Sequence, residues 1–265
     1  MSIRLIALDV DGTLLNDDHQ LSANNIRTLR RAAEQGIKIV LCTGRGSMSA
    51  KPIMDELGLE GVMITHNGAA VTDTNGNVLH EFTFHVREVE DLIRYCREHG
   101  IHYDLNTSTR MLLDQMPADA RKMYDAFMAE PEMVEDVLQV NDPLVKICIF
   151  GNDEQMEQVE RDWPDDLQEL RFIRSGDCFV DVMRPDVSKG IALMKLAEIW
   201  QVDRSEILAM GNYYNDIEML RFAGIGIAVA NSPDEVKQAA DEVTVSNNED
   251  AVHVALSKHL PLIRV

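Results

Sequence analysis

Short apolar runs alternate with amphipathic segments along the first third of the chain. The runs have the length of buried strands, and the segments between them carry apolar residues at helical spacing. One helix begins at Ser22, which can cap it, and continues through Gln35 with Ile26 and Leu29 on its apolar face. The predicted strands are Ile3–Leu8, Ile37–Cys42 and Gly61–Thr65, and a second helix is predicted over Ser49–Leu57. Strands that alternate with helices in short units predict a parallel, doubly wound sheet.

The same alternation returns after residue 188. A helix begins at Lys189, and a strand over Ile207–Met210 leads into a polar loop and a helix that ends at Gly224. The remaining predicted elements are the strands Ile225–Val229 and Val243–Val245 and the helices Pro233–Ala240 and Ala251–His259. The two ends of the chain are therefore predicted to share one α/β architecture.

The middle of the chain has a different pattern. Residues 71–78 predict a hairpin with a polar turn. The clearest strands that follow are Leu144–Phe150 and Cys178–Val182, and a helix from Glu154 to Trp163 ends at Pro164. Residues 107–137, rich in Met and acidic side chains, give only weak signals. The pattern predicts an α+β insert rather than a continuation of the parallel sheet.

Composition and charge limit the possible partners. The 265 residues exceed one typical domain, and a hydrophobic content of 45% supports a sizeable core. The formal net charge of −20 repels nucleic acids and anionic membranes, which argues against both as partners. An acidic chain that binds a phosphate must therefore concentrate a few positive groups and a metal locally. We expect a monomer or a weak homo-oligomer.

The cysteines and the apolar stretches indicate a cytoplasmic protein. The first apolar stretch is interrupted by Arg4, Asp9 and Asp11, which argues against a signal peptide, and no run approaches the length of a membrane span. The four cysteines are widely separated, without a Cys-x-x-Cys pair, as is typical of reduced core residues. They are Cys42, Cys96, Cys148 and Cys178.

The first predicted strand leads into the acidic segment from Asp9 to Leu14. Two carboxylates two positions apart, Asp9 and Asp11, are costly to place together without a cation, because like charges raise each other's pKa. Ligands bind at the carboxyl edge of such sheets, and an aspartyl carboxylate can attack phosphorus. Asp9 is therefore a candidate nucleophile. The alternative is a β-turn, since Asp-Gly pairs are common in turns.

Three further polar loops bring complementary groups. Thr43 and Gly44 offer a hydroxyl and backbone N–H groups that suit phosphate oxygens, and Lys189 offers a positive charge near a helix start. Oxygen ligands and an amide come from Asn212, Asn215 and Asp216. Hard oxygen donors without a His cluster suit Mg²⁺ rather than Zn²⁺.

Each of these loops has a plain structural explanation when it is considered alone. Thr43 and Gly44 would be a loop start, Lys189 a solvated helix charge, and the segment from Asn212 to Asp216 a capping turn. Their joint occurrence, each directly after an apolar strand or at the start of a helix, favours a single catalytic site.

With these motifs the chain resembles a haloacid dehalogenase superfamily phosphatase of the Cof type. The matching segments occur in the family's order and span nearly the whole chain; they are Asp9–Leu15, Thr43–Arg45, Asn67–Ala69, Lys189–Gly190 and Gly211–Asp216. The resemblance implies a Rossmann-like core from residues 1–82 and 183–265, with an inserted α+β cap, residues 83–182, that decides substrate specificity. It also implies a magnesium-dependent phosphatase that hydrolyses a small phosphorylated metabolite, a sugar phosphate or related phosphomonoester, through an aspartyl-phosphate.

The resemblance assigns roles residue by residue. Asp9 would be the nucleophile and a magnesium ligand. Asp11 would protonate the leaving group, later activate water, and place its backbone carbonyl on the metal. The phosphate-binding groups would be Val10, Gly12, Thr43, Gly44, Lys189 and Asn215. The metal ligands would be Asp9, Asp11, Asn212 and Asp216.

One position departs from the family pattern. The family usually has Asp where this chain has Asn212, and an amide oxygen can coordinate magnesium but brings no charge. We expect an active enzyme because Asp9, Asp11, Lys189 and Asp216 are intact. The alternatives are a phosphomutase of the same superfamily, which must exclude water from its aspartyl-phosphate, and a non-catalytic metabolite-binding relative.

The sequence does not select a substrate. Arg45, His66, Asp181 and Arg184 lie near the predicted junctions of core and cap, where each is either a contact to the leaving group or a surface or hinge residue. The family's range includes sugar phosphates, pyridoxal phosphate and a phosphorylated ribitylamino-uracil.

Overall fold

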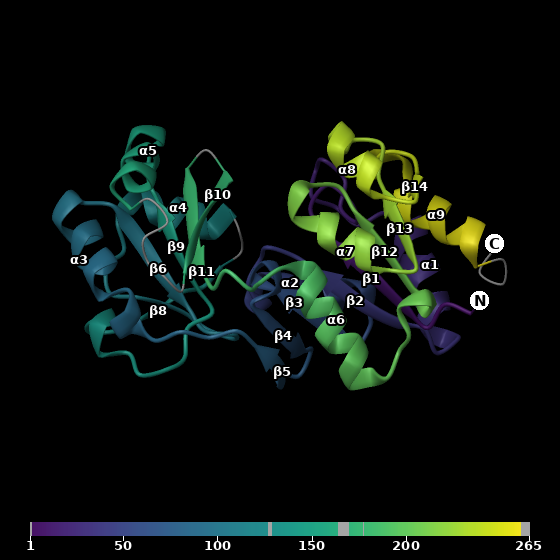
Figure 1. Ribbon diagram of the computed structural model, residues 1–265, viewed down its shortest axis with the longest axis horizontal. Helices are drawn as coiled ribbons and strands as arrows, with labels where there is room; N and C mark the ends of the chain where they lie inside the picture. Colours follow the sequence, from purple (N-terminus) through teal and green to yellow (C-terminus); the bar gives the residue numbers. More distant parts are fainter. Residues whose placement is uncertain (1, 127–128, 164–169, 177, 261–265) are drawn as a thin grey trace. The chain divides into compact units, whose positions relative to one another are not determined.

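The structure is a computed structural model that describes residues 2–126, 129–163, 170–176 and 178–260. The chain forms two compact units (Figure 1). Unit 1 comprises Met1–Arg45, Ala50–His80 and Ser188–Val265, and unit 2 comprises Gly46–Ser49 and Glu81–Val187. The insert thus extends from residue 81 to residue 187 where 83 to 182 was predicted, and the sequence did not indicate that Gly46–Ser49 would join it.

Within the described residues, unit 1 is built on an eight-stranded sheet in the order β14-β13-β12-β1-β2-β3-β4-β5. Neighbouring strands from β14 to β3 pair in parallel, and β4 pairs antiparallel with β3. The strands are β1 (Leu5–Asp9), β2 (Lys38–Cys42), β3 (Val62–Thr65), β4 (Ala70–Asp73), β5 (Val78–Glu81), β12 (Ile207–Gly211), β13 (Ile225–Ala228) and β14 (Glu242–Val243). The predicted parallel sheet is confirmed, and the predicted hairpin forms its antiparallel edge.

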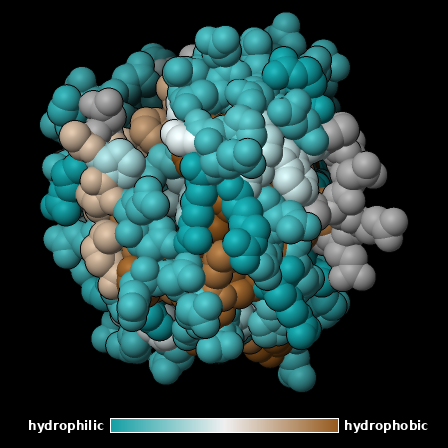
Figure 2. Space-filling view, turned by 90° about the vertical axis from the view of Figure 1, so that its left-hand side faces the viewer, coloured by the Kyte–Doolittle hydropathy of each residue, from teal (hydrophilic) through white to brown (hydrophobic). Residues whose placement is uncertain are grey.

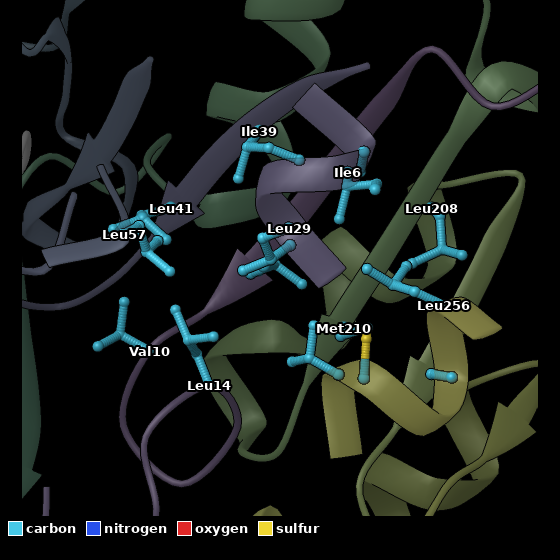
Figure 3. Packing of buried hydrophobic residues seen from close by; sticks show 14 of the residues in the cluster. Ile6, Val10, Leu14, Leu29, Ile39, Leu41, Leu57, Leu208, Met210 and Leu256 are labelled. Atoms are coloured by element: carbon cyan, nitrogen blue, oxygen red, sulfur yellow. The ribbon is translucent and has the colours of Figure 1, made fainter. Parts of the chain in front are cut away.

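Helices cover both faces of this sheet. They are α1 (Ala23–Glu34), α2 (Ser47–Leu57), α6 (Lys189–Trp200), α7 (Ile217–Phe222), α8 (Asp234–Ala239) and α9 (Ala251–His259). Successive side chains of a strand point to opposite faces. Ile6 and Leu8 of β1 therefore pack with α1, α2 and α9, as Figure 3 shows for Ile6 against Leu29 and Leu256. Leu5 and Ala7 pack with α6 and α7 on the other face. This double covering requires strands that are apolar on both sides, which is why they read as continuous apolar runs.

The sheet topology brings the predicted loops together. β1 pairs with β12 on one side and with β2 on the other, and β2 pairs with β3. All four strands are parallel, so their carboxyl ends lie at one edge. The loops that begin after Asp9, Cys42, Thr65 and Gly211 therefore meet there, at the usual ligand-binding edge of an open α/β sheet.

Unit 2 contains a six-stranded, mainly antiparallel sheet in its described part, in the order β10-β11-β9-β6-β7-β8. The strands are β6 (His102–Asn106), β7 (Met111–Leu113), β8 (Glu132–Met133), β9 (Lys146–Phe150), β10 (Arg171–Gly176) and β11 (Phe179–Met183). The helices are α3 (Glu90–His99), α4 (Ala118–Ala126) and α5 (Asp153–Asp162). Apolar side chains of α3 and α5 pack on one face of the sheet, which confirms the predicted α+β insert.

The other face of this sheet carries a polar row whose two aspartates are buried. Asp104, Cys148 and Asp181 stand in register on three neighbouring strands. Lys146 lies 3.1 Å from Asp181 Oδ1, and the Tyr124 hydroxyl of α4 donates a hydrogen bond of 2.9 Å to Asp104 Oδ2. The row is therefore held by charge pairing and hydrogen bonds rather than by apolar contact.

The surface is largely hydrophilic on the face that Figure 2 presents. Smaller apolar patches lie among the hydrophilic residues. Among the described residues, no helix combines the length and the apolar character needed to cross a bilayer.

Candidate active site

The segment after β1 folds into a compact turn. The N–H groups of Leu14 and Leu15 donate to the Val10 carbonyl at 3.1 and 3.0 Å, and the buried Val10 and Leu14 side chains fix the turn in the core (Figure 3). Gly12 has a φ of +78°, and a Cβ there would collide with the Asn212 side chain. Glycine is therefore favoured at this position by the backbone conformation, and a larger residue would have to displace the Asn212 side chain.

Lys189 lies between two carboxylates. Its Nζ donates to Asp9 Oδ1 and to Asp216 Oδ1, each at 2.7 Å, and only 1% of the Lys189 side chain is exposed. Ser188 caps α6 by accepting a hydrogen bond from the Ile191 N–H, which fixes the helix start that carries the lysine. This burial excludes the alternative that Lys189 is a solvated charge at the start of a helix.

The charge balance of this cluster is incomplete. Burial, together with the charge of Asp216, raises the pKa of Asp9 to about 7. Burial alone would lower the pKa of Lys189, but Asp216 and Asp9 raise it above its ordinary value. Two carboxylates that share one ammonium group leave a negative charge when both are ionised, so the site has the electrostatic character that attracts a further cation.

Asp216 organises the loop after β12. Its Oδ2 accepts the N–H groups of Asn212 and Tyr213 at 2.9 and 3.0 Å, while Oδ1 accepts from Lys189. The carboxylate is fully buried and has three donors. Direct metal ligation by Asp216 remains a prediction, and these contacts favour a role in positioning Lys189 and the loop.

Asn212 reaches the acidic motif with one end of its amide. That end lies 2.9 Å from Asp9 Oδ2 and 3.0 Å from the Asp11 carbonyl oxygen. With the nitrogen there, the amide donates to both oxygens. With the oxygen there, it lies about 3 Å from each of the other two oxygens, which is the separation of neighbouring ligands about 2.1 Å from an octahedral Mg²⁺. The predicted donors Asp9, Asp11 and Asn212 therefore fit a magnesium ion.

This donor set contains few charged side chains. Over the part of the chain that the structure describes, no group of three or more His, Cys, Asp and Glu side chains is arranged to hold a metal. The candidate set instead combines one carboxylate with a backbone carbonyl and an amide, all oxygen donors of the type that magnesium accepts.

Arg45 binds the second carboxylate of the motif. Its Nε and Nη2 donate to the two oxygens of Asp11 at 2.8 and 2.6 Å, a bidentate pair, and this hydrogen bonding raises the pKa of the guanidinium. The Asp11 side chain is 44% exposed, while that of Arg45 is 12% exposed. The predicted general acid is thus partly open to solvent, and besides Arg45 its Oδ1 has His19 Nδ1 at 3.7 Å.

The predicted phosphate-binding groups lie on the adjoining loops of unit 1. Thr43 is buried, and its Oγ1 accepts the Arg45 N–H at 3.1 Å, while Asn215 is exposed and donates to Asn67 Oδ1 at 2.9 Å. Two residues that the sequence offered as possible leaving-group contacts, Asp181 and Arg184, belong to unit 2 and not to unit 1. Asp181 pairs with Lys146, and Arg184 forms an exposed pair with Asp186.

A family profile for haloacid dehalogenase-like hydrolases matches residues 6–256. The matched range includes all four loops, from Asp9 to Asp216. The chain belongs to this family. The resemblance that its motifs carry is confirmed, as is the expected fold.

Known relatives of this haloacid dehalogenase-like hydrolase are phosphatases. Phosphatase YwpJ of Bacillus subtilis (strain 168) is 28% identical, with 97% of this chain and 100% of the relative covered. The 5-amino-6-(5-phospho-D-ribitylamino)uracil phosphatase YcsE of the same organism is 28% identical, with 97% and 95% covered. A crystal structure of a haloacid dehalogenase-like hydrolase from Bacteroides thetaiotaomicron has a TM-score of 0.90 and 28% identity, with 98% and 100% covered. The chain is therefore a phosphatase of this family, as predicted.

Reasoning from the sequence missed two contacts of this hydrolase. Arg45 was expected to be either a leaving-group contact or a surface or hinge residue, and its contact with Asp11 was not foreseen. Asn67 was part of a matching motif without a role, and it contacts Asn215 across 148 positions of sequence. The only available signal was position, because both residues follow a predicted buried strand at the same sheet edge.

Proposed function

We propose that this phosphatase hydrolyses a phosphomonoester of a small metabolite in the cytoplasm, through an aspartyl-phosphate on Asp9 and with Mg²⁺ as cofactor. The observation that carries the proposal is the buried Lys189, held 2.7 Å from both Asp9 and Asp216. The buried ammonium group offsets part of the negative charge that the two carboxylates would otherwise present to a phosphate dianion, and a bound Mg²⁺ would offset the rest. The ammonium group also keeps the carboxylate oriented for attack.

The first step transfers the phosphoryl group to the enzyme. An Asp9 oxygen forms a bond to phosphorus as the ester P–O bond breaks, and the Asp11 carboxyl gives its proton to the leaving oxygen. Lys189, the Thr43 hydroxyl and backbone N–H groups of the two loops stabilise the phosphoryl oxygens. Phosphoryl transfer depends mainly on such positioning and charge stabilisation.

The second step releases phosphate. The Asp11 carboxylate takes a proton from water, whose oxygen bonds to phosphorus as the bond to Asp9 breaks. This step restores both aspartates to their starting states. The exposure of Asp11 supports the assignment, because a group that exchanges protons with water must be reached by it.

Magnesium would be held by the Asp9 carboxylate, the Asp11 carbonyl and the Asn212 amide oxygen. Bound there, it would supply positive charge that polarises the phosphoryl group. The approximately 3 Å separations of the Asn212 amide end from Asp9 Oδ2 and the Asp11 carbonyl support this set.

The substrate is proposed at the level of a chemical class. The relative YcsE is named for a phosphorylated ribitylamino-uracil, which is a small metabolite. We infer a substrate of the same general class, a small phosphorylated metabolite, for this chain. Unit 2 would act as the cap that selects it, since inserts on a rigid core commonly carry specificity.

A screen of phosphorylated metabolites, with and without Mg²⁺, tests the proposal. We expect free phosphate in the presence of Mg²⁺, whereas a phosphomutase would give an isomerised product and a non-catalytic relative neither. Acid-quenched enzyme should carry phosphate on Asp9. Asp9→Asn should abolish both signals with its circular dichroism unchanged, while Asp18→Asn, an exposed aspartate beyond the motif, should behave as wild type. Normal turnover by Asp9→Asn would overturn the mechanism.

A further inference from the structure

The turn after β3 has an unusual backbone. His66, Asn67 and Gly68 have φ values of 50°, 55° and 106°. Residues other than glycine seldom adopt positive φ, and two in succession are held only where the surroundings determine them. Asn is among the few side chains that tolerate this region, which makes it a suitable residue for the central position.

The backbone of this turn contacts two of the proposed phosphate-binding segments. The His66 N–H donates to the Arg45 carbonyl at 2.9 Å, and the Asn67 N–H donates to the Thr43 carbonyl at 3.0 Å. On the other side, a Cβ on Gly68 would collide with the Ser188 carbonyl and lie 2.9 Å from the Lys189 nitrogen. The turn therefore fills the space between the Thr43 loop and the start of α6.

The Asn67 side chain contacts two further segments. Its Oδ1 accepts a hydrogen bond of 2.9 Å from Asn215 Nδ2. The same oxygen would lie only 3.0 Å from a Cβ on Gly44, so the amide rests against the glycine backbone. Thr43, Gly44, Lys189 and Asn215 are thus all adjacent to one strained turn.

We propose that Asn67 is a positioning residue for phosphate binding, which it serves by orienting the Asn215 amide. A primary amide nitrogen has two N–H bonds, so the one that Asn67 accepts leaves the other for a phosphoryl oxygen. The acceptor fixes the direction of the free N–H before substrate arrives, which lowers the ordering cost of binding. The inference rests on the proposed role of Asn215.

Asn67→Gly separates the side chain from the backbone. Glycine adopts positive φ without strain, so the turn and the melting temperature should be preserved while the acceptor is lost. We expect the affinity for inorganic phosphate, measured by titration calorimetry, to fall by up to about ten-fold, the usual range for one hydrogen bond. KM for p-nitrophenyl phosphate should rise more than kcat falls.

A double-mutant cycle provides the decisive measurement. If Asn67 acts through Asn215, Asn67→Gly in an Asn215→Ala background should cost no further phosphate affinity. Gln201→Gly is the matched control, because Gln201 has a φ of 53° on the exposed end of α6, away from the site. It should bind phosphate as wild type does.

Two results would overturn the positioning role. The first is that Asn67→Gly binds phosphate with wild-type affinity. The second is that the double variant loses as much phosphate affinity as the two single variants lose together. The proposed function fails in a different way. If Asn215→Ala alone leaves phosphate affinity unchanged, Asn215 does not bind phosphate, and Asn67 then has nothing to position.

Discussion

At the scale of single residues, Asn212 gives the acidic motif a neutral neighbour that can present either a donor or an acceptor. The amide end that faces Asp9 Oδ2 and the Asp11 carbonyl stabilises both oxygens when it is the nitrogen. A metal requires the oxygen instead, so the amide must rotate when a cation binds. Aspartate has no donor to offer, so a chain with Asp at this position depends more strongly on the metal.

Asn212→Asp should therefore increase the response to magnesium. The added charge places a third carboxylate beside Asp9 and Asp216, which lowers the melting temperature in EDTA through repulsion and tightens Mg²⁺ binding through attraction. We expect a larger Mg²⁺-induced rise in melting temperature and a lower Mg²⁺ concentration for half-maximal activity. Asn75→Asp makes the same charge change in an exposed turn and serves as the control. Unchanged magnesium dependence would mean that Asn212 is not a ligand.

Arg45 provides the second prediction at this scale. Its bidentate contact holds the Asp11 carboxylate, whose proposed role as an acid would matter most when the leaving alkoxide is poor. Arg45→Ala should therefore slow single-turnover phosphorylation by alkyl phosphates more than by p-nitrophenyl phosphate, as Asp11→Asn should. Arg45→Lys should recover only part of the loss, because an ammonium group does not form the bidentate pair. Equal losses with both substrate types would assign Arg45 to phosphate binding instead.

The sequence located these residues better than it predicted their partners. Asp9, Thr43 and Asn212 were placed at one sheet edge because each follows an apolar strand. The contact of Lys189 with Asp9 spans 180 positions, and Asp216 was not expected to share that lysine. Such pairings depend on the side-chain directions of separate loops, which no local pattern encodes.

At the scale of elements, the polar row of unit 2 introduces a pH-dependent term into the stability of a sheet. Burial, opposed by Lys146 and the hydrogen bonds to Asp104, raises the pKa of Asp104 from 3.8 to about 6. The folded state therefore binds this proton more tightly than the unfolded chain. The resulting stabilisation is fully present below pH 4 and is lost as the pH rises through 6.

Comparison of wild type with Asp104→Asn isolates this term. As the pH falls from 7 to 4, the free energy of unfolding of wild type should rise relative to the variant by about 2.4 kcal/mol. Trp163 packs in the core of unit 2, so unfolding is followed by its fluorescence in a Trp200→Phe background. Asp91→Asn, at an exposed position of α3, is the control. A pH-independent difference would show that Asp104 keeps its charge when folded.

At the scale of the whole molecule, the order of elements was predictable where the apolar runs are long. The central strands of unit 1, β1, β2, β3, β12 and β13, were expected to within two residues of their ends, because strands covered on both faces are apolar throughout. The strands within residues 107–137 were not expected, because β7 and β8 have only three and two residues and form by pairing with neighbouring strands, β7 with β6 and β8 with β7. Elements so short carry no periodic signal.

The charge of the whole molecule leads to the last prediction. With 45 acidic and 25 basic residues the protein repels a phosphate dianion at long range, although at contact Lys189 would attract it under the proposed mechanism. Salt screens the long-range part over a Debye length of about 10 Å at 0.1 M, while the buried contact is less affected. At saturating Mg²⁺, kcat/KM for a dianionic ester should rise several-fold between about 0.02 and 0.2 M ionic strength.

The same screening should weaken the attraction of Mg²⁺, so the concentration for half-maximal activity should increase. If salt raises kcat/KM for the anionic ester and weakens Mg²⁺ binding, the electrostatic field of the protein is the common cause. Sodium chloride and tetramethylammonium chloride should give the same slopes, because the effect depends on ionic strength and not on the identity of the cation. A fall in kcat/KM with salt would mean that the positive charge of the loaded site already controls the approach of the substrate. The 20 excess negative charges would then serve solubility rather than substrate association.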